Sequence, residues 1–151
     1  MAEQREHEHD DLVGSDSGAA RSGAAYAGDA GSIAAARQFA THFVIRVQGG
    51  HGITVPRDVL GAVQLVVSEL ITNACKYAPG PCVMNLLLTE QTLEITVTDS
   101  SPDLPSAWTA DPDRVGRHGL EIVKALCGGF EVHRAPTGKT IKVRLSLGAS
   151  A

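Results

Sequence analysis

The chain has 151 residues, enough for one domain, with 43% hydrophobic residues and a formal net charge of −4. Seven of its 17 acidic residues but only two of its 13 basic residues lie in residues 1–30, so the remainder is nearly neutral. That remainder has no basic stripe, which argues against nucleic-acid binding. We find no apolar run of the ~18–20 residues that a membrane span needs and no secretory signal, so we expect a cytoplasmic protein without membrane contact.

The first elements follow from composition and periodicity. Residues 1–30 are Ala, Gly, Ser and acid without a period, which predicts a disordered acidic tail before a domain over residues 31–148. Ser32 can cap a first helix over residues 33–47, which has one apolar face. Pro56 suits the first turn of a second helix that runs to about Tyr77.

The second half of the chain alternates between strands and breakers. Residues 100–115 contain three prolines and no period, so a long loop is predicted there, followed by a helix over residues 116–126. Four strands are predicted in two hairpins, residues 83–88 with 93–98 and residues 130–134 with 140–147. The sum is an α+β two-layer sandwich, with helices packed on one face of a mostly antiparallel sheet.

The second helix contains a polar pair among apolar residues. Glu69 and Asn73 are four residues apart and therefore lie on one side of the helix, flanked by Leu65 and Val66. Such partly buried polar groups need partners. Mg²⁺ with a triphosphate would satisfy both, because the Asn oxygen is a hard ligand and the Glu can deprotonate an attacking hydroxyl. When this spacing stands alone, it usually means a solvated Glu and a helix-terminal Asn, so the functional interpretation depends on the motifs that follow.

Two further places have a functional interpretation beside a plain one. Asp99 closes a predicted strand and is either part of an Asx turn or a buried acceptor for the exocyclic amine of adenine. Gly116-Arg117-His118-Gly119-Leu120 opens the third helix. Its free N–H groups and the helix dipole could bind phosphate, with Arg117 adding charge, or it is simply a glycine-flanked helix start.

Gly138-Lys139-Thr140 looks like the end of a phosphate-binding P-loop. That motif needs Gly where this chain has His133, and a strand-to-helix context where the chain has two predicted strands. The tripeptide is therefore interpreted as part of the second hairpin, whose turn is predicted at Pro136-Thr137-Gly138.

Taken in order, the Ala-Ala-Arg-x-Phe stretch around Arg37, the Glu69/Asn73 pair, Asp99 and the 116–120 box resemble the ATP-binding domain of sensor histidine kinases, gyrase and MutL. The closest resemblance is to the bacterial anti-sigma factor serine kinases. It spans about residues 32–147 and implies a Bergerat-type fold that holds Mg²⁺ and ATP beneath a mobile lid, here residues 100–115.

The resemblance also implies roles for single residues. Glu69 would be the catalytic base, Asn73 the Mg²⁺ ligand and Thr140 a support for the adenine-binding Asp99. The ATP-binding residues that it implies are Glu69, Asn73, Lys76, Asp99, Ser101, Gly116, Arg117, His118, Gly119, Leu120 and Thr140. The chain departs from the family where Ser101 replaces the Gly of Asp-x-Gly and where His118 is inserted into the usual Gly-Arg-Gly-Leu.

Residues 1–30 cannot form a phosphoacceptor-His helix, so we expect a free-standing anti-sigma factor and not a complete sensor kinase. Such a protein binds a sigma factor and phosphorylates a Ser or Thr of an antagonist protein. Arg37 either contacts these partners or lies over the core, and the family also allows a homodimer. Two alternatives stay open: an ATP-binding partner switch without phosphotransfer, and a partner-binding domain that has lost its nucleotide.

Overall fold

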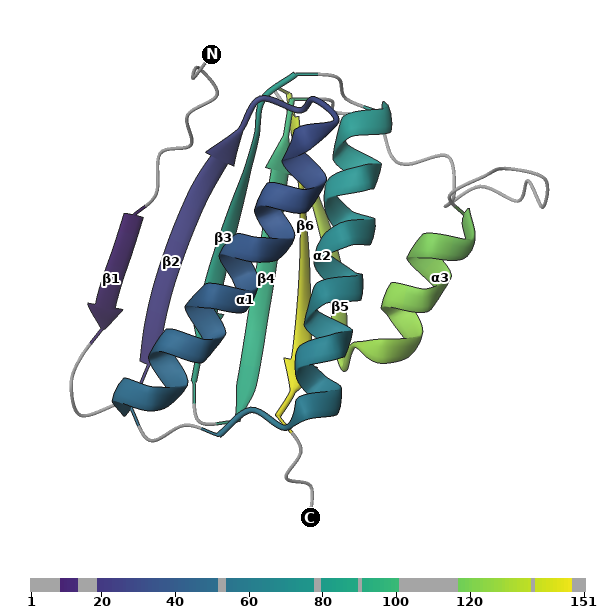
Figure 1. Ribbon diagram of the computed structural model, residues 1–151. Helices are drawn as coiled ribbons and strands as arrows, with labels where there is room; N and C mark the ends of the chain where they lie inside the picture. The colour runs from purple at the N-terminus through teal and green to yellow at the C-terminus, as the bar shows by residue number, and fades with distance from the viewer. Residues whose placement is uncertain are drawn as a thin grey trace.

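The computed structural model describes residues 9–13, 19–51, 54–77, 80–89, 91–100, 117–136 and 138–147. The elements in chain order are β1 (His9–Val13), β2 (Ala19–Tyr26), α1 (Gly31–His51), α2 (Arg57–Tyr77), β3 (Cys82–Leu88), β4 (Thr92–Asp99), α3 (Arg117–Leu126), β5 (Gly129–Ala135) and β6 (Gly138–Ser146). The six described strands form one antiparallel sheet in the order β1-β2-β3-β4-β6-β5. Helices α1 and α2 cross one face of this sheet, and α3 lies beside α2 (Figure 1). The predicted α+β sandwich is confirmed.

The prediction of a disordered tail over residues 1–30 is wrong for β1 and β2. Strand β2 pairs with β3 from Ala20 opposite Leu88 to Tyr26 opposite Cys82, and β1 pairs with the outer edge of β2. Ala20, Ala24 and Tyr26 are buried. Ala, Gly and Ser have low strand propensity, so the pairing with β3 and the packing beneath α1 decide the conformation here.

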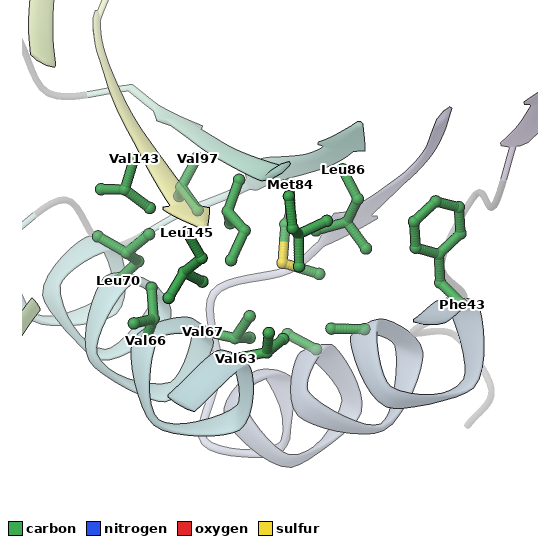
Figure 2. Packing of buried hydrophobic residues seen from close by; sticks show 14 of the residues in the cluster. Phe43, Val63, Val66, Val67, Leu70, Met84, Leu86, Val97, Val143 and Leu145 are labelled. Carbon is green, nitrogen blue, oxygen red and sulfur yellow. The ribbon is translucent and has the colours of Figure 1, made fainter. Parts of the chain in front are cut away.

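The core lies between the sheet and the two long helices. Figure 2 shows side chains of α2 that face residues of β3, β4 and β6 across it, namely Val63, Val66, Val67 and Leu70 opposite Met84, Leu86, Val97, Val143 and Leu145. By length and composition, the α2 segment Arg57–Cys75 is apolar enough to cross a membrane, contrary to our expectation that no segment is. Its buried side packs against the sheet as a core helix does, and this packing accounts for its apolar sequence.

The start of α1 differs in detail from the prediction. The helix begins at Gly31, and Ser32 lies in its first turn instead of before it. The Ser32 hydroxyl accepts hydrogen bonds from the backbone N–H groups of Gly28 and Asp29 and donates to the Asp29 carboxylate at 3.0 Å. Asp29 and Ser32 therefore cap the helix together. This cap lies at the end of the sheet where β2 ends and β3 begins.

Candidate functional site

Strands β4 and β6 bring two charged side chains together at one end of the sheet. Their register places Asp99 opposite Lys139 and Thr98 opposite Thr140. Side chains alternate along a strand, so Asp99 and Lys139 share the helix-covered face with the buried residues of both strands. Thr98 and Thr140 lie on the other face, where their hydroxyl oxygens are 2.9 Å apart.

Asp99 and Lys139 form a buried ion pair. The Lys139 Nζ donates to the Asp99 Oδ2 at 2.6 Å, and the side chains are 0% and 3% exposed. Asp99 is thus a buried acceptor, as its functional interpretation requires. Two charges taken out of water are tolerated only when each neutralises the other, so the pair fixes both side chains in place.

The expectation that Thr140 supports Asp99 is not met, because Lys139 occupies that position. A shift of one residue along a strand moves the side chain to the opposite face of the sheet. The predicted strand begins only at Thr140 and therefore leaves Lys139 out, whereas β6 begins at Gly138. The alternation of Lys139 with Ile141, Val143 and Leu145 was the signal that could have placed Lys139 on the apolar face.

Gly138 sets how closely the two strands meet at the site. A Cβ at this position would collide with the carbonyl oxygen of Asp99 and lie 3.2 Å from the Cα of Ser100. Only glycine allows this approach. The Asp99 backbone and the start of β6 are therefore held together directly beside the ion pair.

Helix α2 brings an unsatisfied oxygen to the same end of the sheet. Asn73 is 5% exposed, and no described residue donates a hydrogen bond to its Oδ1. A buried acceptor without a donor costs about 1–3 kcal/mol, so its presence points to a ligand. Glu69, one turn earlier, is half-buried, and no described residue pairs with its carboxylate.

The Asn73 oxygen fits the Mg²⁺ that the resemblance implies. Mg²⁺ prefers hard oxygen ligands and is usually held by one or two protein groups together with phosphate and water. Within the described part of the chain, no group of three or more His, Cys, Asp or Glu residues could hold a metal ion. An ion at Asn73 would therefore take most of its ligands from the phosphates and from water.

Arg37 projects from α1 toward α2 on the solvent side. It is exposed, and its Nη1 donates to the Ser68 hydroxyl at 3.2 Å. Ser68 directly precedes Glu69, so this contact links the exposed side of α1 to the segment of α2 that contains the candidate base. Its role in partner binding stays a prediction.

Several predicted site residues lie outside the described residues or are described by their backbone alone. Ser101 and Gly116 lie outside the described residues, as does the predicted lid apart from Ser100. The described part of helix α3 begins at Arg117 beside α2, one residue after the predicted start at Gly116. For Lys76, in the last turn of α2, and for Arg117, His118, Gly119 and Leu120, in the first turn of α3, the structure describes the backbone alone. Their nucleotide contacts stay predictions.

All three cysteines are free, and two lie near the site. Cys82 opens β3, and burial raises the pKa of its thiol to about 11, with further contributions from Cys75 and Asp99. Burial also raises the pKa of Cys75. Both thiols are therefore neutral near pH 7 and are poor nucleophiles.

The fold and this site define a nucleotide-binding α+β domain. The family model described as the histidine kinase-like ATPase domain matches residues 27–145, which is most of the chain. The chain therefore belongs to the histidine kinase-like ATPase family, and membership implies ATP binding. The resemblance of the sequence to this ATPase family is confirmed.

Similar solved structures include two from Erythrobacter litoralis EL346. One is the blue-light activated histidine kinase of Erythrobacter litoralis EL346, with a TM-score of 0.44 and 26% identity over 62% of this chain and 32% of the kinase. The other is the histidine kinase domain of that protein, with a TM-score of 0.43 and 24% identity over 61% of this chain and 49% of the domain. The chain thus spans less than half of either protein. No curated protein matches it.

Proposed function

We propose that the chain is an anti-sigma factor with serine/threonine protein kinase activity. It binds ATP with Mg²⁺, transfers the γ-phosphoryl group to a Ser or Thr of an antagonist protein, and sequesters a sigma factor in the cytoplasm. The observation that supports this most strongly is the buried Asn73 Oδ1, which lacks a described donor and lies one helical turn from Glu69. Both residues stand in a domain of the histidine kinase-like ATPase family.

Glu69, Asn73 and Asp99 have separate roles in the proposed phosphoryl transfer. The substrate hydroxyl oxygen attacks the γ-phosphorus, the bond from that phosphorus to the β,γ-bridging oxygen breaks, and ADP leaves. Glu69 accepts the proton that the hydroxyl loses. Asn73 would hold Mg²⁺, which supplies charge neutralisation of the triphosphate when it is bound. Asp99 accepts a hydrogen bond from the exocyclic amine of adenine, and this contact fixes the base end of the nucleotide.

One observation favours a second candidate, an ATP-binding partner switch without phosphotransfer. A catalytic base is normally oriented by a neighbouring group. No described residue forms a hydrogen bond or an ion pair with the Glu69 carboxylate. Binding through Asn73 and Asp99 does not depend on that orientation, whereas phosphotransfer does.

Incubation of the full chain with γ-labelled ATP, Mg²⁺ and a candidate antagonist protein tests the proposal. We expect label on Ser or Thr of the antagonist and none when Glu69 is replaced by Gln. Because Glu69→Gln keeps the shape of the side chain, it is the matched control for the chemistry. ATP binding without label on any candidate antagonist would favour the switch, and absence of ATP binding would contradict both candidates.

A further inference from the structure

The buried ammonium of Lys139 has more donors than partners. A lysine ammonium offers three N–H donors. Among the described residues, the Asp99 carboxylate is the sole hydrogen-bond partner of this side chain, which is 0% exposed. Two N–H groups therefore lie in a desolvated place without a described acceptor, and this is costly unless a ligand supplies one.

The surroundings of the pair suit a flat aromatic ligand. The next residues inward on the same face are Val97 and Ile141, which lie opposite each other and are buried. The ion pair therefore sets a charged acceptor and a charged donor side by side at the edge of the apolar core. Sites for nucleobases combine apolar side chains with hydrogen bonds to the base edge.

We propose that Lys139 is a specificity-determining residue of the nucleotide site and donates a hydrogen bond to ring nitrogen N1 of adenine. Asp99 accepts from the neighbouring amine at C6, so the pair matches the donor and acceptor on that edge of the base. An ionised carboxylate has lone pairs for both Lys139 and the amine. Guanine in the same orientation offers an acceptor to Asp99 and a donor to Lys139, so both contacts would be repulsive. This inference rests on the ATP binding of the proposed function.

The test uses calorimetric titration of the full chain, in Mg²⁺, with ATP and with 1-deaza-ATP, in which a C–H group replaces N1. We expect the wild type to bind ATP at least about tenfold more tightly, which corresponds to ~1.4 kcal/mol. Lys139→Met should bind the two nucleotides equally, and Lys139→Arg, which keeps a donor, should retain the preference. Lys142→Met is the matched control, because Lys142 lies on the same strand but on the outer face.

Each other outcome overturns the inference. Equal binding of ATP and 1-deaza-ATP by the wild type does so without any variant, and so does tighter binding of GTP than of ATP. A folded Lys139→Met protein that keeps the preference for ATP shows that Lys139 does not touch N1. In these cases measurable ATP binding leaves the proposed function standing. Absence of ATP binding to the wild type contradicts the proposed function and the inference together.

Discussion

Removing one member of the buried ion pair should destabilise the ligand-free protein strongly. In Asp99→Leu, the Lys139 ammonium keeps its place in a region where it is 0% exposed but loses its 2.6 Å partner. Breaking a buried pair in this way costs about 3–5 kcal/mol. The double variant Asp99→Leu/Lys139→Met replaces both charges by apolar groups, and such replacements are close to neutral or stabilising. The two effects should therefore be strongly coupled.

Urea unfolding followed by circular dichroism measures this coupling. With a denaturant slope of about 2 kcal/mol per molar, the urea midpoint of Asp99→Leu should fall by about 2 M. The double variant should recover most of the loss, with a coupling energy of at least about 2 kcal/mol. Lys142→Met removes the same charge from the outer face and should stay within about 0.5 kcal/mol of the wild type. The buried pair would be refuted if Asp99→Leu lowered the free energy of unfolding by less than about 1 kcal/mol. It would also be refuted if the loss in the double variant equalled the sum of the losses in the two single variants.

Four further experiments test the candidate base, the exposed side of α1, the close approach at Gly138 and the buried Cys82 thiol. Glu69→Gln should bind ATP within about twofold of the wild type but slow phosphotransfer at least ~100-fold in a label-transfer assay. Transfer at the normal rate would show that Glu69 is not the catalytic base. Arg37→Glu should weaken binding of a sigma factor or antagonist about tenfold without changing ATP affinity, because a reversed charge disrupts an interface contact. Unchanged pull-down of the partner by the folded variant would exclude a role of Arg37 in partner binding. Gly138→Ala should lower the free energy of unfolding in urea by about 1–3 kcal/mol, because the new Cβ would collide with the Asp99 carbonyl oxygen. Gly61→Ala is the matched control, because Gly61 lies in open space on α2, and it should raise the free energy of unfolding by up to about 1 kcal/mol. The pKa of the Cys82 thiol is raised to about 11, so about one molecule in a thousand should carry the thiolate at pH 8. Mass spectrometry should therefore find slow alkylation of Cys82 in the folded protein and fast alkylation in urea.

Most of the fold could be predicted from local patterns. The apolar period of α2 and the alternation of β3, β4 and β6 place each element close to its observed bounds, because in each case the buried face recurs at the period of the backbone. Strand β2 escaped prediction. Its side chains from Ala19 to Ala25 are mostly small, so its alternation is weak, and its strand conformation depends on distant pairing with β3.

In the candidate site too, local geometry predicts some residues, and others depend on long-range strand pairing. Helical geometry alone predicts that Glu69 and Asn73 share one side of α2. The structure places both on this helix, with Asn73 buried and Glu69 half-buried. Lys139 was missed because its partner Asp99 is 40 positions away and the contact depends on the register between β4 and β6. A register error of one residue exchanges Lys139 for Thr140 and a charged partner for a neutral one.

Calorimetric titration of ATP into the wild type and Asn73→Ala, with Mg²⁺ and with EDTA, measures whether the buried Asn73 oxygen holds the metal ion of a nucleotide site. We expect micromolar or weaker binding by the wild type in Mg²⁺, loss of that binding in Asn73→Ala, and little difference between the two proteins in EDTA. If Asn73→Ala binds ATP in Mg²⁺ as tightly as the wild type does, the buried oxygen is not a metal ligand and the proposed nucleotide site is contradicted.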